Sequence, residues 1–137
     1  MGKERLNRYI ASIQSSSFEW GKLDCLIFSN NAFKEYWGFG YADDWIGRYM
    51  NADGPKTKDQ LRKEFGYMRL EPALDDRLRR CPAVVQGALV TTKKTDRWIT
   101  GVALGISIGS RCIFLSKEGM VLLYSEDVEA AWMPNEP

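Results

Sequence analysis

The chain has 137 residues, of which 45% are hydrophobic and 27% charged, and its 19 basic and 18 acidic side chains leave a net charge of +1. These values are typical of a folded globular domain and argue against a disordered chain. A nearly neutral chain predicts no strong binding to nucleic acid or to an anionic membrane. Because the apolar runs are short and no signal-peptide pattern opens the chain, we expect no membrane span, and synthesis and folding in the cytoplasm.

The chain contains three cysteines, Cys25, Cys81 and Cys112, and no histidine. The wide spacing of the cysteines matches no zinc motif, and no acidic loop of the calcium-binding type is present. We therefore expect neither a metal nor another cofactor. Free cysteines are most often small buried hydrophobes, and this interpretation is favoured for Cys81 and Cys112.

Two longer helices are predicted in the first third of the chain. Apolar residues at i, i+3, i+4 and i+7 indicate an amphipathic helix over 3–14. Asp24 is placed to cap the free N–H groups of a second helix, which Cys25 opens and Gly38 ends. The first turn of this helix is apolar on every side, which is typical of a central, buried helix.

Shorter helices are predicted further along. The segment 39–55 shows no clear period. Thr57 and Gln60 match a capping box for a helix over 58–65. A further helix is predicted over 72–80. The end of this helix carries a basic cluster, which consists of Arg77, Arg79 and Arg80. Cations at a helix C-terminus complement the helix dipole, and binding to an acidic partner is the alternative role of the cluster.

After Pro82 the pattern changes to strands. Residues 101–108 alternate, with bulky apolar side chains on one face and small side chains, including Ala103, on the other. A face without bulk lets another element approach the sheet closely. The predicted strands are 88–92, 101–108, 112–115 and 120–124, followed by a short helix or strand over 126–132.

This order of elements predicts an α+β fold, in which N-terminal helices pack on a single layer of C-terminal antiparallel sheet. We expect a single domain over residues 1–137. Its helical half covers about 1–82 and its sheet half about 83–132.

The dipeptide Asp24-Cys25 has the clearest chemical meaning. A cysteine in the first turn of a helix lies where the helix dipole and the free N–H groups stabilise the thiolate, which is the nucleophilic form. A buried structural cysteine is the alternative interpretation. A nucleophilic cysteine also needs a base within hydrogen-bond reach.

Three motifs share a known arrangement: Trp20-Gly21-Lys22-Leu23-Asp24-Cys25, then Gly87-Ala88-Leu89-Val90, then the strand from Val102 to Gly109. Together they resemble the NlpC-type branch of the papain-like cysteine peptidases, in which a cysteine activated by a histidine attacks an amide of peptidoglycan. The resemblance implies that Cys25 occupies the position of the nucleophile. It places Ala88 where the family has an aspartate and Ala103 where it has the catalytic histidine.

Because the chain has no histidine, the substitutes for the base are Glu19, Lys22, Asp24 or a tyrosine. A neighbouring aspartate raises the pKa of a thiol, and a lysine is a poor proton shuttle at neutral pH. Losing the base typically removes a factor of about a hundred to ten thousand from the rate. We therefore predict a pseudoenzyme, in which Cys25 is a vestigial nucleophile beneath a filled-in site that Ala103 faces.

A closer resemblance is to a group of short phage-tail proteins that look like degenerate NlpC domains. It extends from Leu6 to Trp132 and includes Asp44-Trp45-Ile46-Gly47-Arg48-Tyr49, Leu104-Gly105 and Ala131-Trp132 in this order. The resemblance implies a structural component of a tailed-phage tail tip, located in the virion tail. Its partners would be other tail-tip proteins of the hub, distal tail or baseplate, with Asp44, Trp45 and Tyr49 as expected contacts.

Two other functions fit parts of the sequence. A peptidoglycan-degrading cysteine hydrolase of the tail would need a non-standard base, or one supplied by a partner chain. A nucleic-acid-binding accessory would use the basic and aromatic stretch 93–98, although the net charge of +1 favours a solvated hairpin turn there. Asp43 and Asp44 are interpreted as the start of a short helix or loop with a packed Trp45, rather than as a metal or sugar contact.

Overall fold

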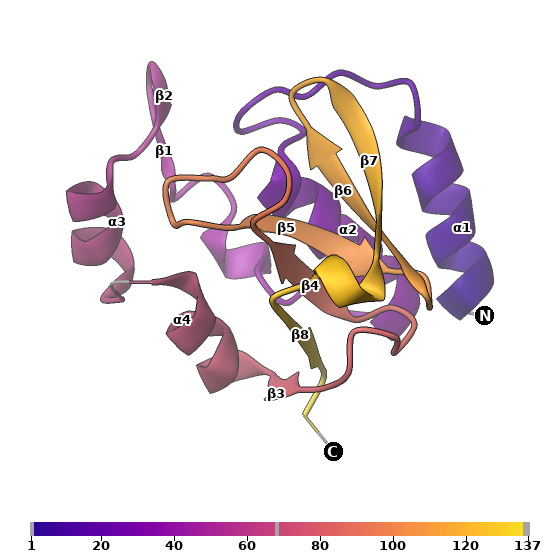
Figure 1. The fold of residues 1–137 in the computed structure, drawn as a ribbon. Helices are drawn as coiled ribbons and strands as arrows, with labels where there is room; N and C mark the ends of the chain where they lie inside the picture. Colours follow the sequence, from indigo (N-terminus) through magenta and orange to yellow (C-terminus); the bar gives the residue numbers. More distant parts are fainter. Residues whose placement is uncertain (1, 68, 136–137) are drawn as a thin grey trace.

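The computed structural model describes residues 2–67 and 69–135 and consists of a six-stranded sheet packed against helices (Figure 1). The strand order is β3-β8-β4-β5-β6-β7, and every neighbouring pair is antiparallel. The predicted α+β class, with helices and an antiparallel sheet, is therefore confirmed. The helices are α1 (Gly2–Ile13), α2 (Cys25–Trp37), α3 (Lys58–Phe65) and α4 (Leu70–Arg77), with short 3-10 helices η1 (Asp43–Trp45) and η2 (Ser125–Asp127). The strands of this sheet are β3 (Arg79–Arg80), β4 (Leu89–Thr92), β5 (Ala103–Ser107), β6 (Arg111–Ser116), β7 (Gly119–Tyr124) and β8 (Ala130–Met133), and β1 (Met50–Asn51) pairs separately with β2 (Gly54–Pro55).

The predicted ends of α2 and α3 are confirmed. Asp24 is extended and its side chain accepts a hydrogen bond from the first turn of α2. Thr57 and Gln60 form the reciprocal capping box at the start of α3. Gly38 and Gly66 follow the two helices with φ angles of 94° and 83°, a left-handed conformation that glycine adopts without a steric penalty.

The helix predicted over 72–80 has different ends. Helix α4 begins and ends earlier, and Leu78 is already extended. Arg79 and Arg80 form β3, which pairs with β8 at the edge of the sheet. Of the three arginines, only Arg77 therefore lies in the helix. The residues expected to form the last turn of the helix instead pair with a strand that is distant in the sequence. The sheet also gains a strand from the region predicted to be the helical half.

The two faces of β5 pack differently from the expectation. Leu104 belongs to the main buried cluster together with Cys25 of α2, whereas Ala103 belongs to a second buried cluster. Because successive residues of a strand point to opposite faces, helix α2 packs on the bulky face of β5 and not on the small one. Gly105 has another reason to be small, since a Cβ atom there would lie 2.5 Å from the ring of Phe114 on the neighbouring strand.

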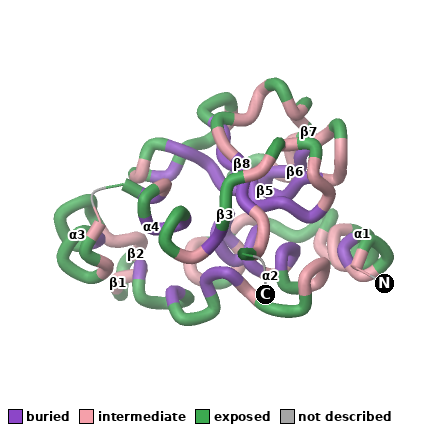
Figure 2. The backbone as a smooth tube through the Cα atoms, turned by 90° about the horizontal axis from the view of Figure 1, so that it is seen from below, coloured by how far each residue is buried: buried purple, intermediate pink, exposed green. Residues whose placement is uncertain are grey.

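Burial decreases from the centre of the sheet to its edges (Figure 2). Every residue of β4 and β5 is buried, whereas the edge strands β3 and β7 are exposed or half-buried. Cys112, on β6, is buried as predicted. The same prediction is wrong for Cys81, which is half-buried because it directly follows the edge strand β3.

Candidate functional site

The loop that leads into α2 is organised around the carboxylate of Asp24, which is fully buried. This carboxylate accepts hydrogen bonds from the Ile27 N–H at 2.9 Å, the Gly21 N–H at 2.8 Å and the Tyr49 hydroxyl at 2.5 Å. A buried carboxylate is tolerated only with such partners, because its desolvation is otherwise very unfavourable. Asp24 therefore holds the helix start, the preceding loop and the Tyr49 side chain together.

Cys25 is the first residue of α2, and only 4% of its surface is exposed. Burial and, secondarily, the charge of Asp24 raise the pKa of the Cys25 thiol to about 12, against hydrogen bonds from nearby backbone N–H groups that lower it. The helix N-terminus was expected to favour the thiolate, but burial outweighs it, and the thiol is protonated at neutral pH.

The groups considered as replacements for a catalytic histidine are engaged elsewhere. Glu19 and Lys22 form an exposed ion pair with each other at 3.2 Å. The Tyr41 hydroxyl hydrogen-bonds a buried serine of α2 at 2.8 Å, and the Tyr49 hydroxyl donates to the carboxylate of the helix cap. Burial raises the pKa of both tyrosines. In the described residues, no hydrogen bond joins any of these side chains to the Cys25 thiol.

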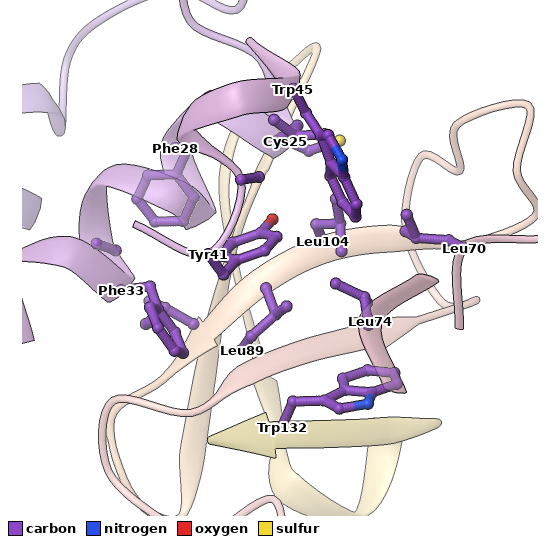
Figure 3. Packing of buried hydrophobic residues seen from close by; sticks show 14 of the residues in the cluster. Cys25, Phe28, Phe33, Tyr41, Trp45, Leu70, Leu74, Leu89, Leu104 and Trp132 are labelled. Atoms are coloured by element: carbon purple, nitrogen blue, oxygen red, sulfur yellow. The ribbon is translucent and has the colours of Figure 1, made fainter. Parts of the chain in front are cut away.

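Cys25 and Ala103 are not brought together. Figure 3 shows Cys25 on the helix side of the sheet, close to Leu104 and Trp45, which belong to the same buried cluster. Ala103 belongs to the second cluster, with Phe114, on the opposite face. The expectation that Ala103 faces Cys25 is therefore wrong, and a histidine at position 103 of this backbone would point away from the thiol.

A pocket that opens to solvent borders Cys25. Aromatic rings line one part of it, among them Trp20 and Trp98. Cationic side chains line another part, where Lys56 is paired with Glu64 at a distance of 3.1 Å between Nζ and Oε1. The remaining charged residues that line this pocket are Asp96, Arg97 and Lys117.

The basic and aromatic stretch 93–98 lies in the connection between the antiparallel strands β4 and β5, as the hairpin interpretation predicts. Lys94 pairs with Asp127 at 2.9 Å, so part of the positive charge of this stretch is compensated within the protein.

Trp98, at the end of the stretch, is not exposed on a solvated turn. It is only 7% exposed and packs edge-on against Tyr49, with 5.4 Å between the ring centroids. No local pattern marks a tryptophan in a loop as buried, so the sequence carried no signal for this contact.

The three residues expected to contact a partner differ in accessibility. Trp45 is 5% exposed and Tyr49 is fully buried, so both belong to the core. Asp44 remains accessible and forms a two-pronged ion pair with Arg77, at 2.6 and 2.8 Å, which lowers the pKa of its carboxyl. The Arg77 guanidinium also lies over the Trp45 ring, 4.2 Å from its centroid. The interpretation of an acidic pair beside a packed tryptophan is confirmed, but Trp45 and Tyr49 offer no contact surface.

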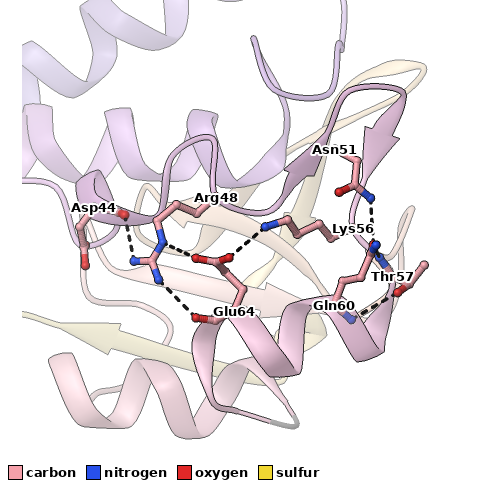
Figure 4. Close-up of polar contacts among 7 residues, drawn as sticks. All are labelled: Asp44, Arg48, Asn51, Lys56, Thr57, Gln60 and Glu64. Atoms are coloured by element: carbon pink, nitrogen blue, oxygen red, sulfur yellow. Dashed lines mark hydrogen bonds and ion pairs between the residues drawn. The ribbon is translucent and has the colours of Figure 1, made fainter.

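Polar contacts attach the segment around Asp44 to α3 (Figure 4). Arg48 donates to the Glu64 carboxylate at 2.9 Å and to the Asp44 carbonyl at 3.4 Å. Lys56 donates to the other oxygen of the same carboxylate at 3.1 Å. Glu64 thus joins two points of the irregular segment to one helix, and both contacts lower its pKa.

Two further findings concern the described part of the chain. No group of three or more His, Cys, Asp and Glu side chains in residues 2–67 and 69–135 is arranged to hold a metal ion. In the same residues, no helix has the length and apolar character needed to cross a membrane.

The fold and the site define a small α+β domain with a buried cysteine at the capped start of its central helix. The chain belongs to the family described as a domain of unknown function, DUF6950, whose model matches residues 2–133. Comparisons of this chain with the curated proteins and with the solved structures found no match.

Proposed function

We propose that this protein is a structural component of a tailed-phage tail tip, in the hub or baseplate region, built on a catalytically inactive papain-like scaffold of the NlpC type. The observation that carries the inactivity is Cys25, which keeps the position of a nucleophile but is protonated at neutral pH, with the groups considered as its base engaged elsewhere. A central helix that opens with Asp-Cys and packs on an antiparallel sheet supports the scaffold, whereas the position of Ala103 on the opposite face of the sheet does not. The placement in the tail rests on the resemblance to short phage-tail proteins, which share the start at Trp20–Cys25 as well as the later motifs Asp44–Tyr49, Leu104-Gly105 and Ala131-Trp132 in this order.

In this proposal the protein is made in the cytoplasm of the bacterial host and becomes part of the virion tail. There it contacts other tail-tip proteins of the hub, distal tail or baseplate. Within the segment from Asp44 to Tyr49, the accessible side chains are the contact candidates, because the aromatic ones are buried. Asp44 and Ile46, which is 38% exposed, meet this condition.

The proposal is tested on purified virions. Mass spectrometry should find the chain at a fixed ratio to the other tail proteins, and phage carrying Cys25→Ala should remain infectious. Ile46→Asp should reduce incorporation of the protein into particles without changing its melting temperature. The purified protein should release no muropeptides from peptidoglycan. Absence from virions, or cleavage that disappears with Cys25→Ala, contradicts the proposal.

The second candidate is a peptidoglycan-degrading cysteine hydrolase with a non-standard base or one supplied by a partner chain. The observation in its favour is the open pocket beside Cys25, through which a side chain of another protein could approach the thiol. With a base from a partner chain, such an enzyme would cleave peptidoglycan only in assembled particles, and with its own non-standard base also as the purified protein. In both cases Cys25→Ala would abolish the cleavage. Equal activity of wild-type and Cys25→Ala particles excludes it.

A further inference from the structure

A second pocket lies between helices α2, α3 and α4 and the connection from β4 to β5, and Trp45 lines it. Its walls are mainly apolar. Leu61 and Leu70, each 7% exposed, line it together with the Phe65 ring, which packs edge-on against Trp45 with 5.8 Å between centroids. Cys25 does not line this pocket, and Trp98 lies in the walls of both pockets.

Two buried polar atoms belong to residues that line this pocket and have no hydrogen-bond partner among the described residues. They are the indole Nε1 of Trp98 and the hydroxyl oxygen of Thr100. Two other indole N–H groups are paired: that of Trp132 donates to Asp75 at 2.8 Å, and that of Trp37 donates to a backbone carbonyl at 2.8 Å. Buried polar groups are nearly always hydrogen-bonded, so two unpaired ones indicate a ligand. This pocket is the one whose lining includes both Trp98 and Thr100, since the pocket beside Cys25 includes Trp98 alone.

The charges around the pocket specify the sign of that ligand. Lys58 and Arg69 line it, and none of the described lining residues is acidic. Arg69 lies 3.9 Å from Glu71, at the outer limit of an ion pair, and its side chain is 69% exposed. An anion is therefore attracted to this pocket, and an apolar group is favoured along its walls.

We propose that this pocket binds a small carboxylic acid with an apolar body. Its carboxylate accepts hydrogen bonds from the Trp98 indole N–H and the Thr100 hydroxyl, both of which can donate. Its ring or branched chain lies against Leu61 and Phe65. The C-terminus of a peptide that ends in an apolar residue has the same chemistry, so the probes must separate a free acid from a peptide.

The direct measurement is an NMR titration of the ¹⁵N-labelled full chain. The chain has five tryptophans, and the indole signal of Trp98 is identified as the one missing in Trp98→Phe. Added 3-phenylpropanoate should shift this signal saturably and more than the other indole signals, and 3-phenylpropanamide should bind at least about tenfold more weakly. N-acetyl-glycyl-phenylalanine is the peptide probe. The tighter of the two carboxylates identifies the source of the ligand, and no saturable shift with either one overturns the proposal.

The hydrogen-bonding groups are tested by variants that keep the shape of the side chain. Thr100→Val should weaken binding of 3-phenylpropanoate by about three- to tenfold, the usual effect of one lost hydrogen bond. It should leave the melting temperature of the ligand-free protein unchanged or higher, because it removes a buried unpaired group. Thr95→Val, in the same connection but outside the pocket, should bind as the wild type does. If Thr100→Val lowers the melting temperature and leaves the affinity unchanged, Thr100 has a structural role and the proposal fails.

Discussion

Replacing Asp24 by alanine should lower the free energy of unfolding by about 3–5 kcal/mol. The substitution removes the N-cap of α2, which typically contributes about 0.5–2 kcal/mol. It also leaves the Gly21 N–H and the Tyr49 hydroxyl without a partner, at about 1–3 kcal/mol for each group that stays buried. These contributions share one carboxylate and are coupled, so we expect a value in the lower half of their combined range.

Urea unfolding at pH 7, followed by tryptophan fluorescence, measures this loss. Thr57→Ala is the matched control, because Thr57 is also an N-cap but is exposed, and we expect it to lower the free energy of unfolding by about 1 kcal/mol. Tyr49→Phe removes only the hydroxyl, so it should destabilise the wild type more than the Asp24→Ala variant. The reasoning is refuted if Asp24→Ala is no more harmful than Thr57→Ala, or if Tyr49→Phe has the same effect in both backgrounds.

Three further outcomes are expected. The urea midpoint should fall as the pH rises from about 9 to about 12. Folding raises the pKa of Cys25 from 9.0 to about 12, so the unfolded chain loses this proton first. The Cys25→Ser variant should show a shallower fall of the midpoint with pH. In the folded protein, Ellman's reagent should react with the half-buried Cys81 and reach Cys25 only on unfolding, and equal rates would contradict the burial described here. In thermal denaturation, Gly87→Ala should lower the free energy of unfolding by about 1–3 kcal/mol more than Gly109→Ala. Both glycines have a positive φ, but only at Gly87 would a Cβ atom meet a ring, that of Tyr36 at 2.3 Å. Equal losses would show that the ring moves aside.

The success of the sequence analysis depended on the range of the interactions that decide each feature. The start of α2 at Asp24 and the capping box of α3 rest on hydrogen bonds between residues three apart, and both are observed. The helix assignment of Arg79 and Arg80 failed because these residues form a strand that pairs with Trp132 and Met133, more than fifty positions later. A helical continuation was locally reasonable, and only the position of β8 made a strand more favourable.

The candidate site divides in the same way. The sequence by itself determined that a cysteine follows a capping aspartate at the start of an apolar helix and that no histidine is available to it. Only the tertiary structure decided that this thiol is buried against Leu104, that Ala103 lies on the opposite face of the sheet, and that Trp98 closes over Tyr49. Capping depends on neighbours in the chain. The ionisation of a thiol depends on how much water all surrounding elements exclude, which is established only when helix, sheet and loop are packed together.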